Sequence, residues 1–171
     1  MEKEFQQLID QHYGILYKIG RVYARDQADF EDLFQEMLIQ LWHSFPRFKG
    51  DSALSTYLYR VVLNTALTHH KKASRRPDYA QLDAYTHLLA DESHHQRSEN
   101  DRRQQQVELL YQCINQLKID DRAIILLHLE GNTYEEMADI LGITITNIGV
   151  RLLRVKKRLH KLLTAAGYER I

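Results

Sequence analysis

Apolar residues recur every three or four positions along most of this 171-residue chain, and no segment alternates apolar and polar residues as a half-exposed strand would. The spacing predicts helices over about residues 5–23 and 29–45, the second ended by Pro46. A third runs from Ser52 or Ser55 to about His70, and later ones cover residues 105–118 and 120–131. We therefore expect an all-α protein.

Residues 73–104 are strongly polar and lose the helical period, apart from one short apolar group formed by Leu82, Tyr85, Leu88 and Leu89. This composition is typical of a flexible linker with at most one short helix in its middle. The expected architecture is two small helical domains: a three- to four-helix domain over residues 1–72, and a four-helix domain over residues 105–171 that ends in a helix-turn-helix.

The helix-turn-helix prediction depends on local signals. Thr133 and Glu136 form a capping box that begins one helix, and Gly142 supplies the positive φ of a tight turn after it. A second helix, capped by Thr144 or Thr146, carries a regular apolar row made of Ile148, Leu152, Val155, Leu159 and Leu162. Two helices joined by so short a turn are typical of a DNA-binding motif.

Charge distribution supports this interpretation although the formal net charge of the chain is zero. Residues 143–171 carry seven Lys and Arg against one acid, whereas residues 106–142 carry two against seven. A basic stripe on the last helix is what a phosphate backbone attracts. The alternative, an amphipathic hairpin whose basic face is only solvated, stays open at this point.

Other classes of function receive little support from the residues. Hydrophobic residues make up 44% of the chain without a run of eighteen, so we expect a cytoplasmic protein with no membrane insertion. The single cysteine, Cys113, lies in an apolar helical run and is expected to be buried. No catalytic motif and no cofactor site emerges. Glu92 and His95 have the spacing of helical metal ligands but lie in the polar linker, so no metal site is predicted.

Three longer motifs carry a family resemblance. Residues 29–42 read D-F-E-D-L-F-Q-E-M-L-I-Q-L-W, residues 48–66 read F-K-G-D-S-A-L-S-T-Y-L-Y-R-V-V-L-N-T-A, and residues 134–143 read Y-E-E-M-A-D-I-L-G-I before a basic helix. In this order, with a linker between the second and the third, they resemble the extracytoplasmic-function (group four) sigma factors of bacterial RNA polymerase. The resemblance implies an alternative sigma factor that is not an enzyme and that directs promoter-specific transcription initiation.

The resemblance also implies partners and sites. Core RNA polymerase would be bound through its β′ clamp and β flap, and an anti-sigma factor would clamp both domains. The face implied to dock on the β′ clamp is the exposed acidic side of the second helix, made of Asp29, Glu31, Asp32, Gln35 and Glu36. A solvated helix face is the alternative for this acidic strip.

Promoter DNA would be bound at two places. The resemblance implies that a base flipped from the minus-ten element is captured by the loop and third helix, at Phe48, Lys49, Gly50, Asp51, Ser52, Tyr57, Arg60 and Asn64. The alternative is that Phe48 and Tyr57 are partly core and that Arg60 pairs with Asp51.

The last helix would read the minus-thirty-five element. Its implied contacts are Thr144, Thr146, Asn147, Gly149, Val150, Arg151, Arg154, Lys157 and Arg158. Many members of the family have G-T-V-K-S-R where residues 146–151 read T-N-I-G-V-R, so Gly149 replaces a lysine and Val150 a serine. The bases that this helix prefers are therefore open.

Two rival interpretations remain from the residues alone. One is a stand-alone helix-turn-helix regulator that binds DNA without polymerase, and the other is a helical metalloenzyme that uses the histidines and acids. The first predicts DNA binding without core enzyme, and the second predicts a stoichiometric metal.

Overall fold

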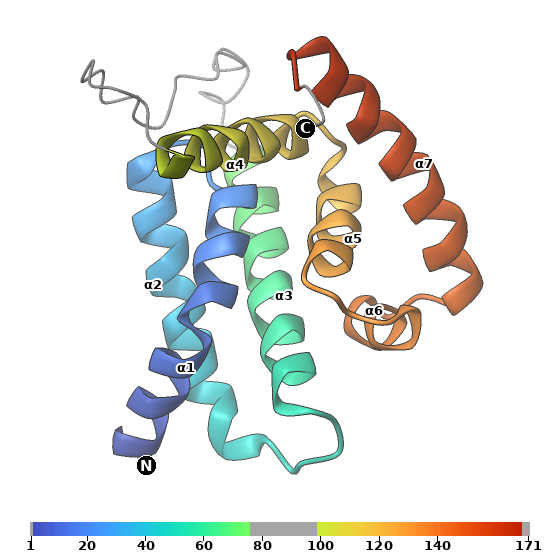
Figure 1. The fold of residues 1–171 in the computed structure, drawn as a ribbon. Coiled ribbons are helices and arrows are strands. Elements are labelled where there is room, and N and C mark those ends of the chain that lie inside the picture. Colours follow the sequence, from blue (N-terminus) through green and yellow to red (C-terminus); the bar gives the residue numbers. More distant parts are fainter. Residues whose placement is uncertain (1, 76–98, 169–171) are drawn as a thin grey trace. The chain divides into compact units, whose positions relative to one another are not determined.

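A computed structural model describes residues 2–75 and 99–168 of the chain, and these residues form α-helices, one 3₁₀ turn and no strand (Figure 1). The all-α prediction is confirmed. The chain divides into two compact units, an N-terminal unit built on α1–α3 and a C-terminal unit built on α4–α7. No helix in the described residues is long and apolar enough to cross a bilayer.

The N-terminal unit is a bundle of α1 (Glu2–Tyr23), α2 (Gln27–Ser44) and α3 (Leu54–Ser74), with the 3₁₀ turn η1 (Phe45–Arg47) after α2. Each helix buries one apolar face, and the core contains Leu16, Ile19, Leu33, Met37, Leu41, Leu58, Val62, Leu63 and Ala66. Helices α1 and α2 approach closely at Gly20, where a Cβ atom would lie 2.6 Å from the Phe30 ring. A larger residue at this position would require the Phe30 ring or the helices to shift.

Two boundaries in this unit differ from the predicted ones. Helix α2 begins before Asp29, because the Asp26 side chain caps it and accepts a hydrogen bond from the Asp29 backbone at 2.8 Å. Helix α3 continues to Ser74, past the expected end at His70. The extra turn of α3 lies opposite the start of α2, and the two line a pocket together.

The C-terminal unit contains α4 (Glu99–Asn115), α5 (Ile119–Leu129), α6 (Tyr134–Leu141) and α7 (Ile145–Ala165). Its core includes Cys113, Ile114, Ile124, Leu127, Met137, Ile148, Leu152 and Val155, so the single cysteine is buried as expected. The predicted start of α4 at residue 105 is too late. Helix α5 begins directly after Lys118, slightly before the predicted start at residue 120, so that Asp120 and Asp121 lie within its first turn. The predicted short helix around Leu82–Leu89 lies outside the described residues.

The turn between α6 and α7 agrees with the prediction in detail. Thr133 and Glu136 form the capping box, with the Thr133 N–H donating to Glu136 at 2.7 Å. Gly142 has a φ of 66°, which L side chains rarely adopt, and it ends α6. Of the two candidate caps of α7, the structure uses Thr144, which accepts a hydrogen bond from the Asn147 backbone. The chain therefore enters α7 in a fixed direction.

Candidate functional site

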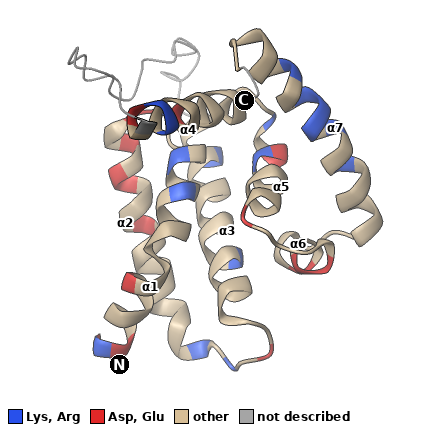
Figure 2. Cartoon of the chain, viewed as in Figure 1, with Lys and Arg blue, Asp and Glu red and all other residues tan. Residues whose placement is uncertain are grey.

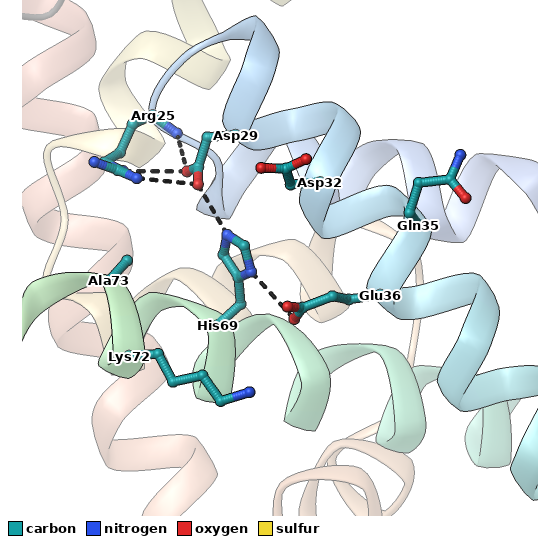
Figure 3. Close-up of a pocket in the computed structure, with 8 residues that line it drawn as sticks. All are labelled: Arg25, Asp29, Asp32, Gln35, Glu36, His69, Lys72 and Ala73. Atoms are coloured by element: carbon teal, nitrogen blue, oxygen red, sulfur yellow. Dashed lines mark hydrogen bonds and ion pairs between the residues drawn. The ribbon is translucent and has the colours of Figure 1, made fainter.

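A pocket of about 290 Å³ opens between α2 and the end of α3 in the N-terminal unit (Figure 3). Most of its lining side chains are charged or polar. They come from the α1–α2 connection, from one face of α2, and from the last two turns of α3: Arg25, Asp29, Asp32, Gln35, Glu36, His69, Lys72 and Ala73. We call it the α2–α3 pocket.

Asp29 is the fixed centre of this pocket. Its side chain is only 8% exposed, and its carboxylate accepts hydrogen bonds from the Arg25 backbone at 2.9 Å and from the Arg25 guanidinium at 3.1 and 3.2 Å. His69 Nε2 lies 2.8 Å from the same carboxylate. The expectation that Asp29 lies on the exposed side of α2 is wrong, because the side chains of Arg25 and His69 contact its carboxylate and it is buried.

Burial and hydrogen bonding act in opposite directions on Asp29. Burial alone would raise the pKa of its carboxyl group, but the hydrogen bonds from Arg25 and His69 outweigh burial and hold the pKa below its ordinary value. Asp29 is therefore ionised at neutral pH and makes these contacts as a carboxylate.

His69 connects Asp29 to a second acid. Its Nδ1 atom lies 3.1 Å from the Glu36 carboxylate, so the two ring nitrogens face two different carboxylates of α2 (Figure 3). This double contact fixes the orientation of the imidazole ring. It also holds the Glu36 side chain, which is 43% exposed, against α3.

The remaining acidic-strip residues differ from these two. Asp32 and Gln35 are exposed at the pocket, and among the described residues neither has a hydrogen-bond or ion-pair partner. Glu31 points to solvent and accepts a hydrogen bond from Gln27 at 2.9 Å. The sequence predicts this strip as uniform, but its residues differ. Asp29 and Glu36 are each bonded to His69, whereas Asp32 and Gln35 are available to a partner.

The loop before α3 is held by aromatic contacts. The ring centroids of Phe48 and Tyr57 lie 4.9 Å apart, and both side chains are half-buried. The Tyr57 hydroxyl donates to the Ser44 carbonyl at 2.9 Å. Lys49, Gly50 and Asp51 are exposed, and Gly50 has a φ of 78°. The two rings support the loop, as the alternative interpretation expects, and the loop presents its polar residues outward.

On α3, Arg60 and Asn64 lie one helical turn apart, Arg60 half-buried and Asn64 exposed. Ser52 is half-buried beside the helix start. Within the part of the chain that the structure describes, no ion pair joins Arg60 to Asp51, so that part of the alternative interpretation is wrong.

Helix α7 carries the basic surface of the C-terminal unit (Figure 2). Arg154, Lys157 and Arg158 are exposed, and so are Thr146 and Asn147 near the helix start. Arg151 differs from them: its guanidinium donates to the Asp121 carboxylate at 2.9 Å and to the Asp120 carbonyl at 3.1 Å. Arg151 therefore fastens α7 to α5 and is not extended toward solvent.

Sequence reasoning missed Arg25, His69 and Lys72 as parts of the pocket. Asp29 and Glu36 lie two helical turns apart, which is a signal that one side chain could bridge them, but nothing local identifies His69 as that side chain. The adjacent pair His69-His70 suggests a metal site, yet the described residues contain no group of three ligands able to hold one. Glu92 and His95 lie outside the described residues.

Comparison with known protein families gives two matches that together span most of the chain. Residues 8–76 match the model of sigma-70 region 2, and residues 107–159 match that of sigma-70 region 4. The first match covers the α2–α3 pocket, and the second covers the helix-turn-helix.

Individual proteins are similar along their length. The RNA polymerase sigma-H factor of Pseudomonas aeruginosa is 30% identical over 149 residues, which cover 82% of this chain and 76% of that protein. The ECF RNA polymerase sigma-E factor of Haemophilus influenzae is 28% identical over 171 residues, with 93% and 87% covered.

Solved structures share the fold. The sigma factor RpoE of Bartonella quintana, solved in complex with the anti-sigma factor NepR, superposes with a TM-score of 0.74 at 24% identity, over 95% of this chain and 98% of that one. CnrH, solved with the cytosolic domain of CnrY, gives a TM-score of 0.66 at 21% identity, over 96% and 90%.

Proposed function

The chain belongs to the extracytoplasmic-function (group four) sigma factors of bacterial RNA polymerase, and on that premise we propose that the α2–α3 pocket is where it seats on the core enzyme. As a sigma factor it binds core polymerase and promoter DNA and directs promoter-specific initiation, and it is not an enzyme. The two rival interpretations, a regulator independent of polymerase and a metalloenzyme, are set aside because both sigma regions match.

One observation carries the docking proposal: Asp32 and Gln35 stand without partners at the edge of a pocket whose other acids are already bonded. The contacts among Asp29, Arg25 and His69 hold α2 and α3 together, and Glu36 lines the pocket beside them. A basic or amide side chain from the β′ clamp then pairs with one carboxylate and one amide on a helix whose neighbouring side chains are already held. Only the Asp32 and Gln35 side chains have to be ordered on binding, which limits the entropic cost.

The division of labour between the units is part of the same proposal. The N-terminal unit opens and captures the minus-ten element with α3 and the loop before it, where Asn64, Lys49 and Asp51 are exposed to a displaced base. The C-terminal unit reads the minus-thirty-five element with α7. Because both units are tethered to one polymerase, each raises the effective concentration of the other at the promoter.

Two further assignments follow from family membership. An anti-sigma factor is proposed as a regulator, because the similar sigma factor RpoE of Bartonella quintana was solved in complex with the anti-sigma factor NepR. Work on core polymerase would also place this protein in the cytoplasm.

The docking proposal is tested with the double variant Asp32→Ala, Gln35→Ala. We expect binding to core polymerase to weaken about 30-fold or more, since truncating interface side chains of this kind costs about 2 kcal/mol. The measurement is fluorescence anisotropy of labelled full-length protein titrated with core enzyme. Gln40→Ala is the matched control, because Gln40 is exposed on α2 but does not line the pocket. Unchanged affinity of the double variant, with its helical content intact, would disprove the docking proposal.

A further inference from the structure

The outward face of α7 contains an apolar pair among cations. Ile148, Leu152 and Val155 face the core, whereas Val150 and Leu153 lie on the opposite side of the helix. Val150 is 55% exposed and Leu153 is 58% exposed, the two highest values for large hydrophobic residues in the described part of the chain. Thr146, one turn before Val150, adds a third methyl-bearing side chain to this row.

Neither sequence neighbour of Val150 covers its side chain on this surface. Gly149 has no side chain, and the nearest atom to where its Cβ would stand is on the Tyr134 ring, at 3.7 Å. Arg151 is turned onto α5 by its bonds to Asp121 and Asp120. A surface that approaches the first two turns of α7 therefore meets the Val150 methyl groups, with no long polar side chain from either adjacent position.

The charges around this pair indicate what kind of surface it meets. Arg154, Lys157, Arg158 and Lys161 are exposed further along α7, and none has an ion-pair partner among the described residues. Four unpaired cations fit a polyanion better than they fit an apolar protein face. In the major groove of DNA the apolar group that a valine can contact is the C5 methyl of thymine.

We propose that Val150, supported by Leu153, is a specificity-determining residue that selects thymine in the upstream promoter element by contact with its 5-methyl group. This inference rests on the proposed insertion of α7 into the major groove. Lys157 and Arg158 supply affinity through phosphates and leave the base preference to Val150.

The test uses holoenzyme formed from the full chain and core polymerase. Run-off transcription from a promoter library first identifies the preferred upstream element. Each thymine of that element is then replaced by deoxyuridine, which removes only the methyl group. We expect one replacement to weaken wild-type binding about fourfold, the factor for one buried methyl-sized group.

The Val150→Ser variant should bind the thymine and deoxyuridine promoters equally at that position. Val107→Ser is the matched control, because Val107 is a 47%-exposed valine on α4, and it should keep the fourfold preference. Equal wild-type binding at every replaced position, a preferred element without thymine, or an undiminished preference in Val150→Ser would each overturn the proposal.

Failure of the underlying groove insertion gives a different result. In that case Lys157→Ala leaves the salt dependence of promoter binding unchanged, and footprinting of the holoenzyme shows no protection of the upstream element. If Val150 instead contacts a protein partner, Val150→Ser binds both promoters as the wild type does, which also overturns the proposal.

Discussion

Four charged or titratable side chains of the α2–α3 pocket, Arg25, Asp29, Glu36 and His69, form one bonded network, whereas the cations on the outer face of α7 have no ion-pair partner among the described residues. In the pocket, Arg25, His69 and two carboxylates of α2 form a continuous set of contacts between 2.8 and 3.2 Å. On α7 it is the backbone that is fixed, by the Thr144 cap and by the Arg151 contact with α5. In the first surface several side chains are held by these contacts, and in the second only the helix itself is held.

This difference fits the two kinds of partner. A protein surface has one shape, so a site with fixed side chains binds it at little entropic cost. A phosphate backbone offers many equivalent oxygens, so long mobile cations can find them once the helix is aimed correctly. Substitutions in the two surfaces should therefore have different effects. Those in the pocket should lower stability or polymerase affinity, and those on α7 should weaken DNA binding in a salt-dependent way.

The sharpest contrast is between Asp29→Ala and Lys157→Ala. Removing the Asp29 carboxylate leaves Arg25 and His69 without their shared acceptor, and we expect the free energy of unfolding to fall by about 2 kcal/mol. Lys157→Ala should change it by less than about 0.5 kcal/mol and instead lower the slope of log affinity against log salt by about 0.9. Urea unfolding followed by circular dichroism, which reports both units, and promoter titrations at several salt concentrations measure the two effects. Equal losses in the free energy of unfolding for Asp29→Ala and Lys157→Ala would contradict this difference between the two surfaces.

If α2 docks as proposed, we expect His69 to act on docking through Glu36, as a positioning residue. His69→Gln should weaken binding to core polymerase roughly fivefold, about 1 kcal/mol, because Glu36 then loses its fixed orientation. Thr68→Ala, an exposed change one position away on α3, is the control.

A merely structural role for His69 is separated by a double-mutant cycle. If His69 works through Glu36, the effects of His69→Gln and Glu36→Gln on polymerase affinity are not additive. Additive effects would show that the two residues act independently.

Acid should weaken the two units in different pH ranges. Burial, with the nearby Lys156 ammonium, lowers the pKa of His128 on α5, so its contribution to stability is present above about pH 6.5 and is lost as the pH falls through the lower folded-state value. The pKa of Asp29 is also lowered, so its contribution persists to about pH 4 and is lost only below.

Two probes on the full chain separate these ranges. Trp42 is the single tryptophan and lies in the N-terminal unit, whereas circular dichroism reports both units. Between about pH 7 and pH 5, the dichroism transition should shift to lower urea more than the Trp42 transition does, and His128→Gln should reduce that shift. A His128→Gln protein with the wild-type pH profile would contradict this assignment.

Features that depend on neighbouring residues could be predicted from the sequence. The Thr133–Glu136 capping box, the Gly142 turn and the Thr144 cap are local, and the structure contains all three. The apolar faces of the long helices are equally local, because a 3.6-residue period needs no knowledge of the partner helix.

Features that depend on distant residues could not be predicted. His69 meets Asp29 across forty positions, and Arg151 meets Asp121 across thirty. No local pattern distinguishes Arg151, which is bonded to α5, from Arg154, which is exposed. The early start of α4 was missed for another reason: residues 99–104 have no apolar period, but Glu, Arg and Gln favour a helix without one.

The burial of Cys113 makes the native chain convenient for spectroscopy. Burial raises the pKa of its thiol and so disfavours the reactive thiolate. A cysteine introduced at an exposed position such as Gln40 or Thr146 would then be the fast-reacting group in an otherwise unaltered protein. Dye pairs attached in this way, one on α2 and one on α7, would report the distance between these two helices as the sigma factor moves from free solution to polymerase and promoter.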